Sequence, residues 1–333
     1  MNRREALISS TAALALSGCA EAAPAAAPFP MRRGVNLGNA LEAPQEGEWG
    51  YRIEAAHLQA LAAAGFDGVR LPVRWDAHAG MRAPYPIEAG FLRRVSEVVE
   101  AALGLGLQVQ LNAHHYEAVN ANPAGERSRF LGIWRQIAGH FRGAPAGLYF
   151  EPLNEPNGEA LSGRALTALQ QAALSAIRET HGERLVIFGG PNWSSIDGLF
   201  DWRPPTGERI AASVHYYEPH GFTHFGAEWL PQPETPPDRA SSWGDAAERA
   251  RMAQHAQRAA AWARARGLSL QLGEFGVNRA LSLAQRANWT RACRRNFEAL
   301  GVGWCVWDFA GAFPIWDEAR GAFFPEMLSA LME

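Results

Sequence analysis

Residues 148–156 read Leu-Tyr-Phe-Glu-Pro-Leu-Asn-Glu-Pro, a mostly apolar stretch that ends in the polar pair Asn154 and Glu155. A short apolar run that ends at a turn residue is typical of a strand buried on both faces of a parallel sheet. Polar side chains at the point where such a strand ends are typical of a site built at one edge of the sheet. The number of similar strands in the chain then decides the fold.

Other stretches of the chain have the same character. The eight expected strands are residues 34–37, 69–73, 109–115, 148–154, 185–189, 212–217, 268–275 and 304–309. Stretches with a helical spacing of apolar residues alternate with them, for example 91–105. Eight β-then-α units predict a single-domain (β/α)8 barrel, the TIM barrel, in the α/β class. An open doubly wound sheet is the alternative, but no Gly-x-Gly-x-x-Gly motif follows an early strand, and eight similar strands favour closure.

The composition indicates a large folded chain and argues against nucleic acid as a partner. The chain has 333 residues, of which 47% are hydrophobic, so it can bury a large core. The basic residues are all arginines, and these 31 stand against 34 acidic residues, for a formal net charge of −3. A chain without a basic field has little to attract a phosphate backbone.

Tryptophan is frequent, at twelve residues, and its large flat ring serves a core or a ligand platform equally well. Trp49, Trp229 and Trp307 follow expected strands or lie in their loops, so we expect them to be platforms. For Trp193 both roles stay open. The tryptophans in or beside expected helices, where we expect packing, are Trp75, Trp134, Trp262 and Trp289.

Polar side chains recur at the carboxyl ends of several expected strands. The alternating sets are Asn112 and His114; Ser213, His215 and Tyr217; and Leu270, Leu272 and Glu274. Period two predicts that each set lies on one face of its strand. Barrel closure would gather these ends with Arg70 and Glu155. A barrel interior keeps such groups only where they pair with one another.

Two of these residues, Glu155 and Glu274, are carboxylates at the ends of the fourth and seventh expected strands. Paired carboxylates with separated pKa values are what the cleavage of a glycosidic bond requires, because one must be protonated and the other ionised. The supporting roles that we expect are a charge from Arg70 that keeps Glu274 ionised, a hydroxyl donor in Tyr217, a ligand for the sugar 2-hydroxyl in Asn154 and a stacking ring in Trp307.

Seven blocks of the sequence resemble glycoside hydrolase family 5, in the same order, from about Arg33 to the C-terminus. The blocks are Val35-Asn36-Leu37-Gly38-Asn39, Val69-Arg70-Leu71-Pro72, His114-His115-Tyr116, Leu153-Asn154-Glu155-Pro156, His215-Tyr216-Tyr217, Gly273-Glu274-Phe275 and Trp307-Asp308-Phe309. The resemblance implies a retaining mechanism without a cofactor, with Glu155 as acid/base and Glu274 as nucleophile. The family's other active-site positions fall on Arg70, His114, Asn154, His215, Tyr217 and Trp307.

Residues 38–44 and 222–224, together with Trp229, look like a subgroup of endo-acting enzymes on β-1,4-glucan, some of which also cut β-mannan. In that subgroup the residues that would touch sugar are Asn39, Glu42, His115, His224 and Trp229. His115 is out of phase with His114, so a place behind the site is its alternative role. Pro314, where relatives often have Gly, puts the shape of the eighth loop in doubt.

A long loop, residues 218–245, follows the sixth expected strand and carries five prolines. A loop of this length inside a compact domain is usually functional, so we expect it at the face that holds the site.

Several other interpretations stay open or are rejected. Glu151 has no counterpart among the seven blocks, so we expect it to pair structurally. A zinc site of His215, His220 and His224 is disfavoured because no Cys partner or His-Glu-x-x-His motif accompanies it, and we predict no metal. The remaining alternatives for the activity are β-mannan, xyloglucan or β-1,3-glucan as substrate, an exo-acting glucosidase, and a non-catalytic glycan-binding barrel.

The N-terminus resembles an export signal. Arg3 and Arg4 precede a short apolar stretch at 6–16, which is too short for a membrane span. Leu16-Ser17-Gly18-Cys19 resembles a bacterial lipobox, so residues 1–19 are interpreted as a signal peptide with Cys19 as the lipidated residue. Ordinary cleavage near residues 20–22, which would release a soluble protein, is the alternative.

The remaining regions complete the predicted organisation. Residues 20–30 are rich in Ala and Pro and are interpreted as a tether, and residues 31–333 as the catalytic domain. We expect an exported monomer of the cell envelope or the extracellular space, with a membrane contact only through lipid at Cys19. Cys293 and Cys305 lack metal-ligand spacing, and we expect two buried free thiols.

Overall fold

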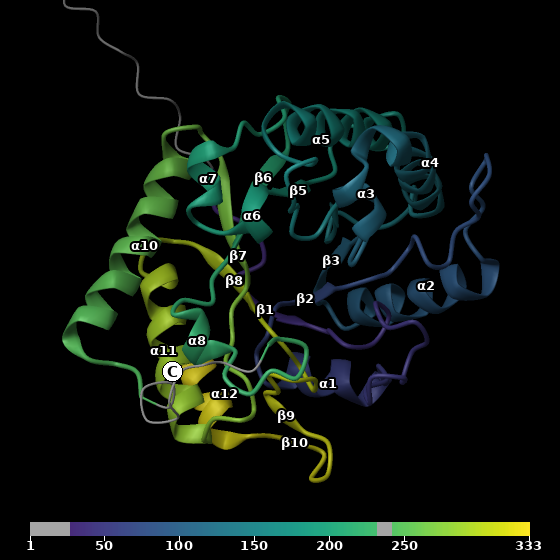
Figure 1. The fold of residues 1–333 in the computed structure, drawn as a ribbon. Helices are drawn as coiled ribbons and strands as arrows, with labels where there is room; N and C mark the ends of the chain where they lie inside the picture. The colour runs from purple at the N-terminus through teal and green to yellow at the C-terminus, as the bar shows by residue number, and fades with distance from the viewer. Residues whose placement is uncertain (1–26, 232–241) are drawn as a thin grey trace, which may run out of the picture.

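The computed structural model describes residues 27–231 and 242–333. Its centre is a closed barrel of eight parallel strands in sequence order, β1 to β8, and helices surround it (Figure 1). The predicted (β/α)8 fold is therefore confirmed. The predicted signal peptide with Cys19, residues 20–26 of the predicted tether and residues 232–241 of the long loop lie outside the described residues.

Most strands end earlier than the sequence pattern predicts. They are β1 Arg33–Asn36, β2 Gly68–Leu71, β3 Gln108–Asn112, β4 Leu148–Glu151, β5 Val186–Gly189, β6 Ile210–His215, β7 Ser269–Glu274 and β8 Gly303–Val306. His114, Asn154, Tyr217 and Trp307 consequently lie in the loops directly after the strands. Loops at that end of a (β/α)8 barrel are where its active sites form.

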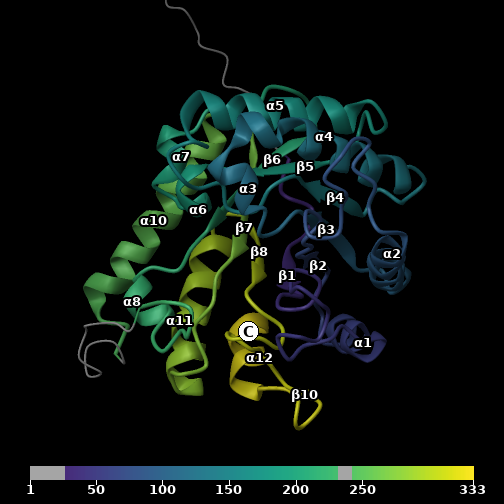
Figure 2. The same ribbon diagram turned by 45° about the vertical axis from the view of Figure 1, so that its right-hand side comes forward.

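Long helices cover the outside of the barrel, as the second view shows (Figure 2). They are α1 Ala55–Ala63, α2 Ala89–Gly104, α4 Pro123–His140, α5 Gly163–Arg178, α10 Ala246–Arg264, α11 Leu283–Glu298 and the C-terminal α12 Pro325–Met332. Short helices lie in the loops: α3 Glu117–Ala121, α6 Pro191–Ser194, α7 Gly198–Asp201 and α8 His220–Thr223. After β8, the strands β9 Trp316–Asp317 and β10 Ala322–Phe323 pair antiparallel. None of the described helices is long and apolar enough to cross a membrane.

Capping residues define where α10 and α11 begin. The side chains of Asp245 and Ser282 each accept a hydrogen bond from the backbone N–H three residues on, and Glu248 and Gln285 bond back to the capping residues. These capping boxes satisfy N–H groups that have no partner inside a helix. They mark the end of the loops that follow β6 and β7.

A β-bulge interrupts the pairing of β6 with β7. Val214 pairs with Leu272, but His215 pairs with Glu274, so Gly273 is an extra residue. The predicted shared face of Leu270, Leu272 and Glu274 is therefore wrong, because one extra residue inverts the phase of a strand. Leu270 and Leu272 belong to the large core that includes the helices, while the bulge brings the carboxylate of Glu274 to Arg70 inside the barrel.

The base of the barrel is closed by the residues that precede β1. Phe29 and Met31 are buried, and Phe29 packs edge-on against Tyr149 at a centroid distance of 6.1 Å. Met31 lies where Cβ atoms on Gly34, Gly68 and Gly303 would collide with it. Phe29, which belongs to the predicted tether, is thus part of the packed base of the barrel.

The two cysteines of the described residues, Cys293 on α11 and Cys305 on β8, are free and buried, which confirms the prediction. Cys305 belongs to the apolar cluster at the base of the barrel, with Phe29 and Met31.

Candidate active site

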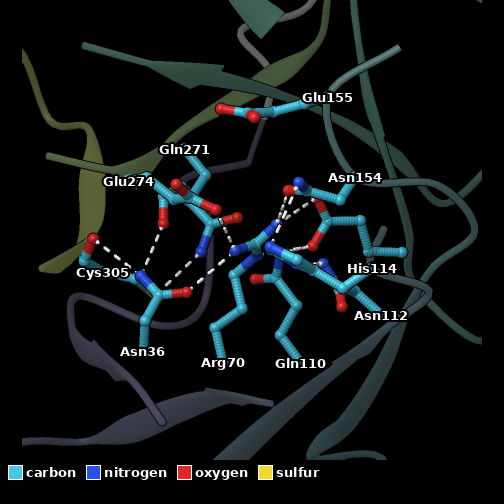
Figure 3. A network of polar contacts seen from close by, with 12 residues as sticks. Asn36, Arg70, Gln110, Asn112, His114, Asn154, Glu155, Gln271, Glu274 and Cys305 are labelled. Carbon is cyan, nitrogen blue, oxygen red and sulfur yellow. Dashed lines mark hydrogen bonds and ion pairs between the residues drawn. The ribbon is translucent and has the colours of Figure 1, made fainter. Parts of the chain in front are cut away.

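Arg70 of β2 is the centre of a buried polar network (Figure 3). Its guanidinium donates to both oxygens of Glu151, at 2.7 and 3.0 Å, and to Oε1 of Glu274 at 2.6 Å. It also donates to Oδ1 of Asn36 at 2.8 Å and to Oδ1 of Asn154 at 2.6 Å. The expectation that the polar strand-end residues pair with one another is thus met.

The Arg70 network determines the ionisation state of Glu151, an acid inside the barrel. Burial alone would raise the pKa of its carboxyl, but the charge and hydrogen bonds of Arg70 outweigh burial and lower it. Gln110 adds a donor to Oε2 at 2.8 Å. Glu151 is therefore an ionised structural partner of Arg70, as the sequence led us to expect.

Glu274 lies at the end of β7 and is nearly buried, with 6% of its side chain exposed. Besides Arg70, the hydroxyl of Tyr217 donates to its Oε2 at 3.0 Å. Burial raises the pKa of Glu274, and His215 and Arg70 oppose the rise. The predicted contacts are present, but Arg70 shares its single charge with Glu151, so it offsets the burial of Glu274 only in part.

Glu155 lies just after β4 in a left-handed backbone conformation, with φ of 44°, and 26% of its side chain is exposed. In Figure 3 its carboxyl group lies apart from the Arg70 network. The carboxyl group pairs with the ring of His215, whose Nδ1 lies 2.7 Å from Oε1. Burial raises the pKa of Glu155 to about 7, and the nearby charge of Glu151 adds to the rise. Burial also lowers the pKa of His215 to about 4, so the ring is neutral near pH 7.

The two carboxylates converge. One oxygen of Glu155 and one of Glu274 lie within 4.8 Å of each other and of a ring nitrogen of His215. A separation of about 5 Å is typical of retaining glycosidases, whereas inverting enzymes keep roughly 6.5–9.5 Å. Among the described residues these three side chains are also the one set placed to hold a metal ion. His215, His220 and His224 do not form such a set there, so the zinc interpretation gains no support.

A large pocket of about 1670 Å³ opens over these residues. Of the predicted site residues, those in its wall are Asn39, His114, His115, Glu155, His215, Tyr217, His224, Trp229, Glu274 and Trp307. Arg70 and Asn154 lie beneath the wall, 0% and 8% exposed, and reach the pocket through their contacts with other residues. Most of the predicted residues are therefore brought together in one place.

Glu42 is the exception among the predicted sugar contacts. It is 1% exposed, and its carboxyl accepts the backbone N–H groups of Asn39 and Ala40. Burial raises its pKa to about 8. The structure thus places Glu42 behind the pocket wall, where it fixes the turn that carries Asn39, and the expected direct contact with sugar is corrected.

Exposed aromatic rings line the same pocket. Trp49 and Trp229 are 43% and 58% exposed, and Trp307 stacks on His114 with a centroid distance of 5.6 Å. Trp193, left open by the sequence, is 59% exposed and belongs to this group. The predicted packing residues Trp75, Trp134, Trp262 and Trp289 are buried.

Asp308 is a residue of the site that sequence reasoning missed. It is fully buried, accepts the backbone N–H groups of Gly311 and Phe313 at 3.2 Å each, and accepts a hydrogen bond from the side chain of Asn39. It therefore ties the loop after β8 to the turn after β1. Its place in the Trp-Asp-Phe block was visible in the sequence, but an acid next to a stacking ring gives no sign of its partners. Pro314 follows Phe313 in the pocket wall.

Comparison with known families gives a single consistent result. The model of a family described as cellulase (glycosyl hydrolase family 5) matches residues 30–312. Endoglucanase H of Acetivibrio thermocellus is 31% identical over 315 residues, which are 91% of this chain and 33% of that protein. The chain thus spans about a third of the length of this curated relative.

Solved structures agree with the sequence matches. Cel5A of Thermotoga maritima, solved with cellobiose and with mannotriose, has a TM-score of 0.86 and 34% identity, covering 91% of this chain and 97% of that one. The cellulose synthase subunit Z (CcsZ) of Clostridioides difficile has a TM-score of 0.86 and 31% identity, covering 91% of this chain and all of that one, at 100%. With the match over most of its length and the paired carboxylates at the ends of β4 and β7, the chain belongs to glycosyl hydrolase family 5.

Proposed function

We propose that the chain is a retaining endo-β-1,4-glucanase that works through a covalent glycosyl-enzyme intermediate. Glu155 is its acid/base and Glu274 its nucleophile. The observation that carries the proposal is the pair of carboxylate oxygens within 4.8 Å of each other in one large pocket. Their surroundings differ in the way that the two roles require. Glu274 accepts a hydrogen bond from the charged guanidinium of Arg70, whereas Glu155 contacts the neutral ring of His215.

In the first step, ionised Glu274 attacks the anomeric carbon while protonated Glu155 donates its proton to the departing glycosidic oxygen. Arg70 and Tyr217 hold Glu274 by one oxygen each, which fixes the direction of the carboxylate. The pKa of about 7 leaves much of Glu155 protonated at neutral pH, as an acid must be. The products are a glycosyl ester on Glu274 and a shortened chain.

In the second step, Glu155, now ionised, takes a proton from a water that attacks the same carbon. Glu274 leaves as a carboxylate, and two inversions give net retention of configuration. The pKa of Glu155 near neutrality suits both directions of proton transfer.

A neutral β-linked polysaccharide is the substrate class that the pocket suits. The exposed rings of Trp49, Trp193 and Trp229 lie on loops that follow different strands, so they offer stacking surfaces along an extended chain. β-Mannan is the second candidate, because the structure of the similar Cel5A was also solved with mannotriose.

A polysaccharide panel with product analysis tests the activity. We expect the purified chain to cut carboxymethyl cellulose or mixed-linkage β-glucan, with viscosity falling before many reducing ends appear. Glu274→Ala is the matched control for contaminating activity. Release of glucose alone would support an exo-acting enzyme instead, and activity at the level of the control, with glycan binding intact, would support the non-catalytic alternative.

We also propose that the chain is exported and anchored to a membrane by lipid at Cys19. We propose further that it acts as a monomer on β-glucan and needs no cofactor. The lipobox-like residues 16–19 support this placement. Expressed at full length in a bacterial host, the protein should fractionate with membranes and incorporate labelled palmitate. Cys19→Ala should abolish the label and release the protein, and a label that survives the substitution would refute the anchor.

A further inference from the structure

The β-bulge beside the two carboxylates leaves two buried polar atoms facing one glycine. Gly273 is the extra residue of the bulge between β6 and β7. A Cβ atom on Gly273 would lie 2.4 Å from Oγ of Ser213 and 3.0 Å from Nε2 of His215. Both polar atoms therefore converge on the same side of Gly273, where a side chain would collide with them, and they lie no farther apart than these two distances added together. One water molecule can hydrogen-bond to two atoms at such a separation.

Neither of these atoms has a partner among the described residues. Ser213 is 0% exposed and His215 4% exposed, yet Oγ and Nε2 make no hydrogen bond with any described protein atom. Buried polar groups are nearly always hydrogen bonded, and a small polar space with converging groups is where proteins hold a single buried water. The geometry thus points to a ligand that can both donate and accept.

The other ring nitrogen of His215 faces the reaction centre. Nδ1 lies 2.7 Å from Oε1 of Glu155 and 3.6 Å from Oε2 of Glu274. Because the pKa of His215 is lowered to about 4 by burial, the neutral ring carries one proton, on either nitrogen. The hydrogen bond at Nε2 therefore decides whether Glu155 meets an N–H donor or a lone pair.

We propose that Ser213 is a positioning residue for the reaction: its hydroxyl holds one water against Gly273, and this water donates to Nε2 of His215 and so keeps the ring proton on Nδ1, facing Glu155. The proposal rests on the proposed function of Glu155 as the acid/base. The hydroxyl of Ser213 makes no hydrogen bond with either carboxylate, and it acts through His215.

The proposal gives a definite sign for the loss of the hydroxyl. With the proton on Nε2, ionised Glu155 loses a donor and meets a lone pair, so the pKa of Glu155 rises. Protonated Glu155 then donates to Nδ1 instead of to the glycosidic oxygen. Loss of the Ser213 hydroxyl leaves in place the charged and titratable groups that face His215 from the surrounding strands. These groups are Glu151 on β4, Glu155 just after β4, Glu274 on β7, Arg70 on β2 and His114 after β3.

Ser213→Ala tests the proposal in kinetics. We expect kcat/KM on a cello-oligosaccharide to fall about tenfold, because the proton of the acid is misdirected. The alkaline limb of its pH profile should move to higher pH, because the pKa of Glu155 rises. An aryl cellobioside with a good leaving group needs no acid, so its kcat/KM should change less than about twofold. Thr290→Val is the matched control, because it removes another buried hydroxyl without a described partner, on α11, and should leave both rates unchanged.

The ring proton itself provides a test that does not depend on activity. In enzyme labelled with ¹⁵N-histidine, the signals of His215, assigned with His215→Gln, should show a protonated Nδ1 in the native chain and in Thr290→Val. Ser213→Ala should shift the proton toward Nε2. If Ser213→Ala keeps the proton on Nδ1, or lowers both rates equally with no shift of the pH profile, the proposal is wrong. If the native chain cuts neither substrate but the ring of His215 is protonated as predicted, the proposed function is refuted and the positioning role of Ser213 toward His215 is not.

Discussion

Glu155 and Glu274 carry the same carboxyl group in different surroundings, although their oxygens lie within 4.8 Å of each other. Glu274 is 6% exposed and accepts from a guanidinium and a phenol. Glu155 is 26% exposed, and its partner is a neutral imidazole. A charged donor stabilises an ionised carboxylate more strongly than a neutral one does.

The difference shows that the placement of the two carboxylates and their protonation states are determined by different parts of the barrel. The ends of β4 and β7 bring the two groups together, while β2 and β6 determine what each one contacts. Arg70 reaches Glu274 but also serves Glu151, which is why burial still raises the pKa of Glu274. Variants should therefore separate the two carboxylates by mechanism and not only by the size of the loss.

The largest effect is expected for Glu274→Ala. Without the nucleophile, turnover of every substrate should fall on the order of 10⁴-fold or more. Azide should partly restore reaction with an activated aryl cellobioside and give a glycosyl azide of inverted configuration, because the small anion enters from the side of the missing carboxylate. Wild-type-like hydrolysis of the activated substrate would contradict the assignment.

Glu155→Ala should show a smaller loss that depends on the leaving group. On a polysaccharide or a cello-oligosaccharide, loss of the acid should lower kcat/KM about 10²–10⁴-fold. With an activated aryl cellobioside the same constant should fall far less, because that leaving group departs without protonation. Azide should here give a product of retained configuration, since it replaces the water of the second step. Equal losses on both substrates would remove Glu155 from the acid role.

The pH profile of the native chain should separate the two groups without substitution. Glu155 must be protonated to act, so kcat/KM on a cello-oligosaccharide should fall about tenfold per pH unit above about 7, where Glu155 loses its proton. Glu274 must be ionised, and its raised pKa puts the acid limb above that of an ordinary glutamate. An aryl cellobioside with a good leaving group should keep the acid limb and lose much of the alkaline one. An alkaline limb that is identical for both substrates would assign it to a group other than Glu155.

The sequence predicts the barrel and its carboxylate pair well, because both depend on local signals. Eight apolar runs predict the strands, and polar residues at their ends predict the site. The pattern of residues 268–275 predicts the wrong face for Leu270 and Leu272, since a bulge at Gly273 depends on the neighbouring strand. Glu42 and Asp308 show the same limit, because which backbone N–H groups a buried acid accepts is decided by loops that are distant in sequence.

The smallest effect is expected for Tyr217→Phe. The hydroxyl donates to Oε2 of Glu274 at 3.0 Å, and this bond favours the ionised carboxylate. Its loss should raise the pKa of Glu274, so the acid limb of kcat/KM moves to higher pH and the rate near neutrality falls about tenfold or less. The alkaline limb should stay in place, because Glu155 keeps His215 as its partner.

Tyr149→Phe is the matched control for this prediction, because it removes a phenol hydroxyl at the base of the barrel, where the partner is Gln108. It should leave both limbs unchanged. If Tyr217→Phe moved the alkaline limb instead, the phenol would act on Glu155, and the two carboxylates would not be tuned by separate partners. A shift of the acid limb alone would mean that Arg70 by itself does not set the ionisation of Glu274. Residues on and just after β6 would then tune both carboxylates, Glu274 through Tyr217 and Glu155 through His215.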